Sequence, residues 1–177
     1  MKITRYKDIP QFIQHGQYEV DVSPDRLIKS IDEMVVEHKL QLDPDFQRGH
    51  IWNRPQQQAF IEFFLRGGKT AKVVYLNFPS WSRNATTDYN DFVIVDGKQR
   101  LEAWRQFFDN KIKAFGSYAK DFTDSLRIMA TMKMNVNTLQ TKAEVLQWYL
   151  DFNSGGVVHT DEELDRVKQL LKKEKKK

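Results

Sequence analysis

A short apolar run that ends at a glycine turn is the feature that most constrains how this chain folds. Phe92-Val93-Ile94-Val95 is continuous and apolar, which is typical of a short strand buried on both faces. Asp96-Gly97 ends the run, and Leu101, Trp104 and Phe108 then follow at the spacing of one helical face. The sequence therefore predicts a strand, a tight turn and a helix in direct succession.

Hydrophobic spacing predicts further elements on both sides of this unit. A helix is expected from Ser23, a natural N-cap, to Lys39. The alternation of apolar and polar residues from 126 to 137 is typical of a half-buried strand. The other predicted elements are helices at 55–66 and 141–152, a last helix that begins at Thr160, and a strand at 72–78. Helices and strands mixed in this order predict an α+β fold.

The length and charge of the chain indicate one neutral domain with a basic end. At 177 residues the chain suffices for one hydrophobic core and is too short for two ordinary domains. We expect a single domain over residues 1–171 and a basic lysine tail at residues 172–177. The tail holds five of the 28 basic residues and one of the 24 acidic ones, so the remainder carries 23 of each. We interpret the tail as a solvated helix end or as a weak, salt-sensitive contact for a polyanion.

Residue types and motifs that are missing narrow the classes of site. The sequence contains no cysteine, which excludes disulfides, thiol catalysis and thiolate zinc sites. Its four histidines lack metal-ligand spacing, and it contains neither a complete Walker phosphate loop nor a serine nucleophile elbow. No run of about 18 apolar residues occurs. We therefore expect no membrane span and a cytoplasmic location.

The turn between the predicted strand and helix carries the chemistry that we consider most informative. Unpaired N–H groups and the helix dipole make a helix start a ready anion site, and Gly97 lets the backbone approach a phosphate closely. Lys98 adds a point charge, and Arg100 can bind two phosphate oxygens at once. Gln99 can orient a water or read a base edge. Asp96 is the one acid in the motif and the candidate for holding a divalent cation or accepting a proton.

Structural explanations compete with this interpretation. Asp96 can simply cap the helix while the two cations remain solvated. Arg48, in the turn-forming segment from Asp43 to Gly49, can form a structural ion pair. Asn153 precedes Ser154-Gly155-Gly156, and a helix C-cap explains those glycines completely.

Four motifs in order resemble one known family. They are Asp45-Phe46-Gln47-Arg48-Gly49-His50-Ile51-Trp52, Val95-Asp96-Gly97-Lys98-Gln99-Arg100-Leu101, Phe152-Asn153-Ser154-Gly155-Gly156 and Thr160-Asp161-Glu162-Glu163-Leu164. The set is similar to the ParB/sulfiredoxin-like nuclease superfamily, in the branch that forms the N-terminal domain of GmrSD-type modification-dependent restriction enzymes. The resemblance implies a compact mixed sheet with flanking helices, in which the Asp-Gly-x-Gln-Arg turn binds phosphate. In relatives that turn serves nucleoside triphosphate hydrolysis, and superfamily members also cleave or clamp DNA.

The resemblance also implies roles for particular residues. The residues that it places at the pocket are Asp96, Gly97, Gln99 and Arg100 on the turn, Gln47 and Arg48 on the earlier loop, and Asn153 at a helix end. Lys98 departs from the family motif, which has glutamine there, and raises the local positive charge. Restriction-enzyme relatives also carry a C-terminal nuclease domain that this sequence does not reach, so any cutting is expected in this domain or in a partner.

These observations lead to one hypothesis and its alternatives. The hypothesis is a phosphodiester or phosphoanhydride hydrolase of DNA metabolism, a stand-alone DNA-nicking endonuclease of bacterial or phage origin. Arg48, Lys98 and Arg100 would neutralise charge on phosphorus, while Asp96 would hold Mg²⁺ or align water. DNA is the expected partner, with a nucleoside triphosphate as a second ligand. The alternatives are a non-catalytic nucleotide-sensing or DNA-binding module, and a phage-type inhibitor that acts through its surface.

Overall fold

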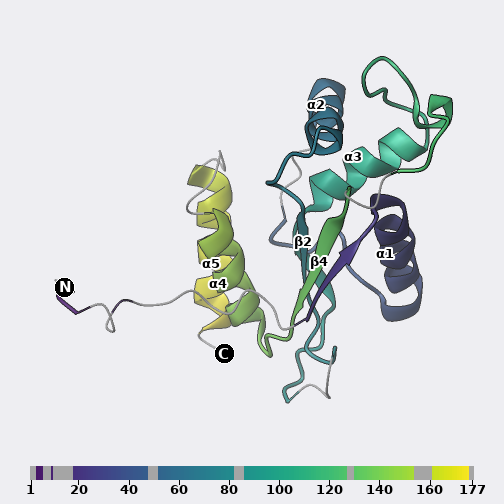
Figure 1. Ribbon diagram of the computed structural model, residues 1–177. Coiled ribbons are helices and arrows are strands. Elements are labelled where there is room, and N and C mark those ends of the chain that lie inside the picture. The colour runs from purple at the N-terminus through teal and green to yellow at the C-terminus, as the bar shows by residue number, and fades with distance from the viewer. Residues whose placement is uncertain are drawn as a thin grey trace.

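A four-stranded mixed sheet forms the centre of the protein in the computed structural model (Figure 1). The structure describes residues 3–5, 9, 18–47, 52–81, 86–126, 130–153 and 161–175. The strands are β1 (Tyr18–Val22), β2 (Val73–Asn77), β3 (Val93–Asp96) and β4 (Met132–Asn137), in the spatial order β1-β4-β2-β3. β1 runs antiparallel to β4, β2 parallel to β4, and β3 antiparallel to β2.

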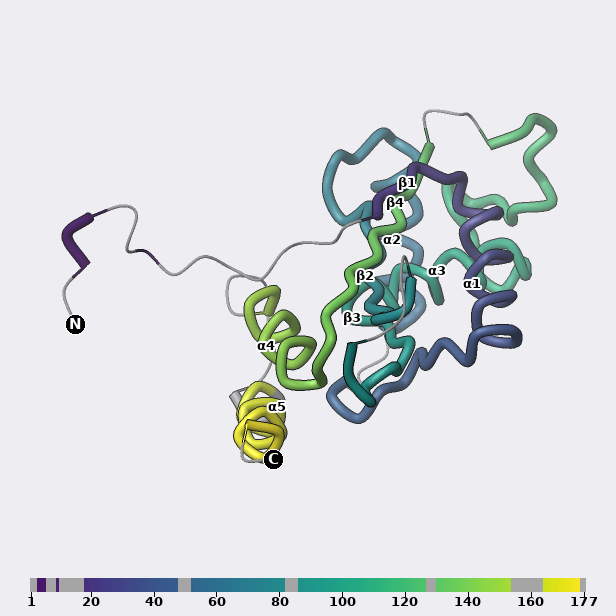
Figure 2. Tube along the Cα trace, turned by 90° about the horizontal axis from the view of Figure 1, so that it is seen from below, coloured from purple at the N-terminus to yellow at the C-terminus, as the bar shows by residue number. Residues whose placement is uncertain are grey.

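Five α-helices in the described parts of the chain cover the two faces of this sheet. They are α1 (Pro24–His38), α2 (Arg54–Leu65), α3 (Lys98–Phe108), α4 (Lys142–Asn153) and α5 (Asp161–Glu174). The first three pack together on one side, and α4 and α5 lie on the other, as the two views agree (Figures 1 and 2). The α+β fold is thereby confirmed.

Two apolar clusters hold these layers together. On the side of α1 to α3, the fully buried Leu27, Phe64 and Trp104 pack against Val74 and Ile94 of the sheet. On the other side, Val93 and Val95, which alternate with Ile94 along β3, pack with residues of α4 and α5 in the second cluster. It comprises Phe46, Val93, Val95, Val145, Leu146, Trp148, Tyr149, Val167 and Leu171. Burial on both faces explains why the β3 segment is an uninterrupted apolar run, as the sequence predicted.

Local signals set the ends of several helices as expected. Pro24 occupies the first turn of α1 after Ser23. The backbone N–H of Glu144 donates to Thr141 Oγ1 over 3.2 Å, and the Glu144 carboxylate accepts from the Thr141 backbone N–H over 3.0 Å. This is the reciprocal pattern of a capping box at the start of α4. Thr160, the expected start of the last helix, lies outside the described residues, and α5 continues to Glu174. The first lysines of the expected tail, Lys172 and Lys173, are therefore helical.

Two predictions about strands were wrong. The strand expected over residues 126–137 begins only at Met132, and it is not half-buried, because β4 lies between β1 and β2 with helices over both faces. Asn135 and Asn137, expected to face solvent, are 5% and 1% exposed. The sequence analysis also missed β1, an edge strand. No helix in the described parts of the chain is long and apolar enough to cross a membrane.

Candidate functional site

The β3–α3 turn is shaped by a glycine that no other residue can replace without strain. β3 ends at Asp96, Gly97 has a φ of 106°, and α3 begins at Lys98 without a side-chain cap. A Cβ on Gly97 would lie 3.0 Å from Val74 Cα, so the turn sits directly against β2. Glycine is required here for two reasons, the positive φ of the backbone and the close packing of the turn against β2.

Asp96 and Arg100 pair across the first turn of α3. The Arg100 guanidinium donates through Nη2 to Asp96 Oδ2, and the same nitrogen donates to Val73 O over 2.9 Å. The Arg100 side chain is 15% exposed and that of Asp96 is 38% exposed. Asp96 therefore does not cap α3, and Arg100 is not solvated, so that alternative is wrong on both counts. Arg100 Nε is buried and has no hydrogen-bond partner among the described residues.

Lys98 forms an ion pair with Asp43, from the loop between α1 and α2. Asp43 is 77% exposed, so water screens the pair strongly. Lys98 can therefore exchange this carboxylate for another anion at small cost, which Arg100 in its more buried pair cannot.

Two glutamine side chains bind the loop before α2 to the turn. Gln47 Nε2 donates to the carbonyl oxygens of Ile94 and Val95 over 3.2 and 2.9 Å. Gln99 Oε1 accepts from the backbone N–H of Trp52 over 2.9 Å. The structure thus brings Gln47 and Gln99 together at the site, where each fixes backbone rather than standing ready for a ligand. Arg48 lies outside the described residues, between these two attachment points.

The end of α4 packs against β2 beside the turn. Phe152 packs on Tyr75 with ring centroids 4.4 Å apart, and Tyr75 is the β2 residue paired with Asp96. Asn153 Nδ2 donates to Tyr149 O over 2.6 Å within the helix, in keeping with a helix-end role. Gly155 and Gly156 lie outside the described residues.

Tyr75 is a site residue that the sequence analysis did not single out. Burial raises its pKa, the nearby negative charge of Asp96 adds to that shift, and Arg100 opposes it. Its place in an aromatic strand segment was consistent with core packing alone. Only the pairing of β2 with β3 brings it to Asp96.

The described residues limit which ligands the site can hold. They contain no group of three histidine, cysteine or acidic side chains that could bind a metal ion. Asp43 pairs with Lys98, which leaves Asp96 as the carboxylate of the turn itself. One carboxylate suits Mg²⁺ held together with substrate phosphate and water. A cavity of about 940 Å³ lies at the other end of α3, between Phe107, Phe122 and the start of α1. None of the predicted site residues that the structure describes lines it.

The sequence matches one known protein family over most of the residues that form this site. Residues 28–144 match the family described as GmrSD restriction endonuclease, N-terminal domain. The match runs from α1 to the start of α4 and contains the β3–α3 turn and Gln47. Comparisons with curated proteins and with solved structures found no match. The matched segment exceeds half of the chain, so this protein belongs to the family of the GmrSD restriction endonuclease N-terminal domain, with a restriction-endonuclease-related role in DNA metabolism.

Proposed function

We propose that the protein hydrolyses a phosphodiester or phosphoanhydride bond at the β3–α3 turn, as a DNA-nicking endonuclease. The observation that carries the proposal is the start of α3. Gly97 provides no side-chain cap, Lys98 and Arg100 occupy the first turn, and Asp96 ends the preceding strand. A helix start of this kind favours a bound anion, and the family match supports DNA as the source of that anion.

In this proposal each residue of the turn has a separate task. Lys98 leaves Asp43 and neutralises a phosphate oxygen, because its pair is the more solvent-screened of the two. Arg100 holds the Asp96 carboxylate and β2 in place. Asp96 aligns the attacking water and accepts its proton as the water oxygen bonds to phosphorus and the ester oxygen leaves. Arg48 is the further cation that the family motif contributes.

Mg²⁺ is the metal that fits this donor set. When bound, it would neutralise charge on the transferred phosphoryl group. Asp96 would then hold it instead of accepting the proton of the water, with Gln47 and Gln99 keeping the surrounding backbone in position. A nucleoside triphosphate is the second ligand of the same chemistry, since its phosphates present the same oxygens to the helix start.

One observation favours a second candidate, a non-catalytic DNA-binding or nucleotide-sensing module. Arg100 and Asp96 bind each other and the Arg100 guanidinium also binds backbone, so neither stands ready for a ligand in this arrangement. A module that retained the turn for structural reasons would show the same contacts.

A plasmid assay separates the two candidates. Purified protein is incubated with supercoiled plasmid and Mg²⁺, with and without each nucleoside triphosphate, and both relaxation and phosphate release are followed. The hydrolase predicts open-circular product, lost in Asp96→Asn and reduced in Lys98→Gln. About a hundredfold loss is the scale expected for a positioned acid or base.

The matched control lies on the same helix. Arg105 pairs with Asp32 at the other end of α3, so Arg105→Gln and Asp32→Asn remove the same groups away from the turn. Both controls should nick plasmid at the wild-type rate. Binding of nucleotide or DNA without turnover would support the module instead. If the protein neither binds nor turns over these ligands, only the alternative of an inhibitor that acts through its surface remains.

A further inference from the structure

Five basic side chains without an ion-pair partner among the described residues lie at one end of the molecule, although the chain outside the lysine tail is formally neutral. Several basic side chains in the described residues pair with carboxylates, among them Lys98, Arg100, Arg105, Lys133 and Lys142. Others form no ion pair with any described residue, and these are spread over several elements, as Lys29 on α1 and Arg54 on α2 show. Five of them lie together at one end of the molecule. They are Arg66, Lys69, Lys72, Lys113 and Lys120, which we call the cationic surface.

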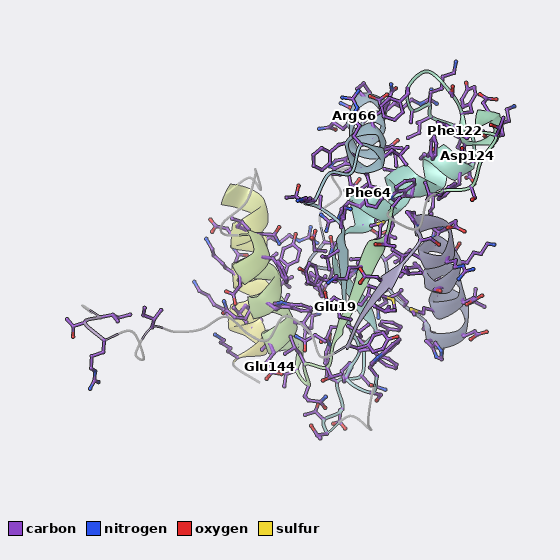
Figure 3. The ribbon with its side chains drawn as sticks, in the orientation of Figure 1. Glu19, Phe64, Arg66, Phe122, Asp124 and Glu144 are labelled. Atoms are coloured by element: carbon purple, nitrogen blue, oxygen red, sulfur yellow. The ribbon has the colours of Figure 1, made fainter. Side chains whose placement is uncertain are left out.

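Tertiary contacts, not sequence, bring the cationic surface together. Arg66 ends α2, and its guanidinium lies 5.2 Å from the centre of the Phe115 ring in the segment after α3. The Phe115 backbone N–H donates to Glu62 Oε1 over 2.9 Å, which fixes that segment against α2. Figure 3 shows Arg66 and Phe64 at the same end of the molecule as Phe122 and Asp124 of this segment.

Aromatic rings hold most of these cations in place. Lys72 Nζ lies 4.9 Å from the centre of the Phe64 ring, and Lys113 and Lys120 lie 4.8 and 5.9 Å from that of Tyr118. A cation over a ring face keeps its charge and remains open to an anion on its other side. The surface is thus ordered before any ligand arrives.

The cationic surface continues to the candidate site. The Lys133 backbone N–H donates to Lys72 O over 2.8 Å, and Arg100 binds the carbonyl of the next residue, Val73. The carboxylates that the structure describes at this end are Glu62 and Asp121, which both accept backbone N–H groups, Asp109, which pairs with Lys111, and Asp124 (Figure 3). Because Lys111 offsets Asp109, the five cations of the surface outnumber the three remaining carboxylates.

We propose that the cationic surface binds the phosphate backbone of duplex DNA and leads it to the β3–α3 turn. The inference rests on the proposed DNA-directed function and adds the surface that grips the substrate. Charge complementarity selects the partner, because duplex DNA presents a regular array of phosphates and the family match points to DNA metabolism. All five residues of the cationic surface act as backbone contacts without base specificity.

The test measures DNA binding and needs no turnover. Anisotropy of a fluorescein-labelled 20-base-pair duplex is followed without Mg²⁺ between 50 and 200 mM NaCl. Each phosphate contact contributes about −0.9 to the slope of log affinity against log salt, so five contacts give about −4.5. Over this salt range each contact accounts for about a 3.5-fold loss of affinity.

Paired variants make the result specific to the surface. Lys113→Gln with Lys120→Gln, and Arg66→Gln with Lys72→Gln, should each reduce the slope by about 2. Lys168→Gln on α5, whose lysine pairs with Asp165, should leave it unchanged. Lys172→Gln with Lys173→Gln tests the C-terminal lysines. Far-UV circular dichroism and the thermal midpoint establish that each variant is folded.

Failure of this inference and failure of the proposed function give different results. Unchanged slopes in the folded surface variants, or a slope that falls only in the Lys172 and Lys173 variant, would overturn the inference even if plasmid is nicked. Reduced slopes in the surface variants with no nicking by wild-type protein would leave the DNA-binding surface standing and remove the hydrolase. A further result would also refute the inference. If polyglutamate displaces the duplex from the protein, and the salt slope for polyglutamate equals that for DNA, the surface binds acidic polypeptides.

Discussion

Replacing Gly97 by alanine should destabilise the fold by about 2–5 kcal/mol. The φ of 106° places a side chain in a region that costs about 1–2 kcal/mol for an L-residue. The new Cβ would also lie 3.0 Å from Val74 Cα and 3.1 Å from Val74 Cγ2. Crowding of this kind in a packed region costs about 1–3 kcal/mol more. Because Val74 Cα is backbone of the central part of the sheet, it cannot simply move aside.

Urea unfolding followed by tryptophan fluorescence measures this loss, and Gly67→Ala is the matched control. Gly67 has a φ of 85°, yet a Cβ there would meet nothing within 4 Å, so only the backbone cost applies. We expect Gly97→Ala to lose about 1–3 kcal/mol more than Gly67→Ala, with an unchanged denaturant slope. Equal losses at the two positions would refute the reasoning that the turn is packed against β2.

Three further predictions concern stability. Gln47→Leu should lower the free energy of unfolding by about 1–3 kcal/mol in the same assay, because the carbonyl oxygens of Ile94 and Val95 lose their donor. A loss under about 0.5 kcal/mol, which is less than one ordinary hydrogen bond contributes, would contradict the attachment. Thr141→Ala should cost about 1 kcal/mol by removing the α4 cap, while Thr141→Ser should retain most of it. Burial raises the pKa of Tyr89 above its ordinary value of 10.0, so the tyrosine ionises first in the unfolded chain and stability falls as pH rises above 10. In Tyr89→Phe that fall should be shallower by up to about 1.4 kcal/mol per pH unit, and an identical alkaline limb would contradict it.

Local signals in the sequence were sufficient for most elements. Apolar spacing and caps located the helices to within about two residues, as is usual for assigned ends. β1 was missed although Tyr18, Val20 and Val22 alternate with two acids, which is a strand signal. The alternation in β4 predicts one solvent-exposed face, but the exposure of a strand depends on its neighbours in the sheet and on the helices that cover it. β1, which pairs with β4, lies far from it in the sequence, so the pattern within residues 126–137 carries no sign of that neighbour.

The sequence was sufficient to name most residues of the site, but it did not predict which residues they contact. The glycine turn, the basic first turn of α3 and Gln47 were all named from sequence. The partners of Arg100 and Gln99 come from β2 and from the loop before α2, 27 and 47 residues away. No local pattern encodes such contacts. The same holds for the cationic surface, whose members come from two segments on either side of α3.

Nuclear magnetic resonance of the backbone amides tests the central claim, that the β3–α3 turn binds phosphate. A ¹⁵N-labelled sample is titrated with a 12-base-pair duplex and Mg²⁺, at salt low enough for saturation. We predict that the amide signals of Gly97, Lys98 and Arg100 shift together, and that they stay in place in Lys98→Glu. If those signals do not move while amides elsewhere in the protein report full binding, phosphate does not bind at this turn.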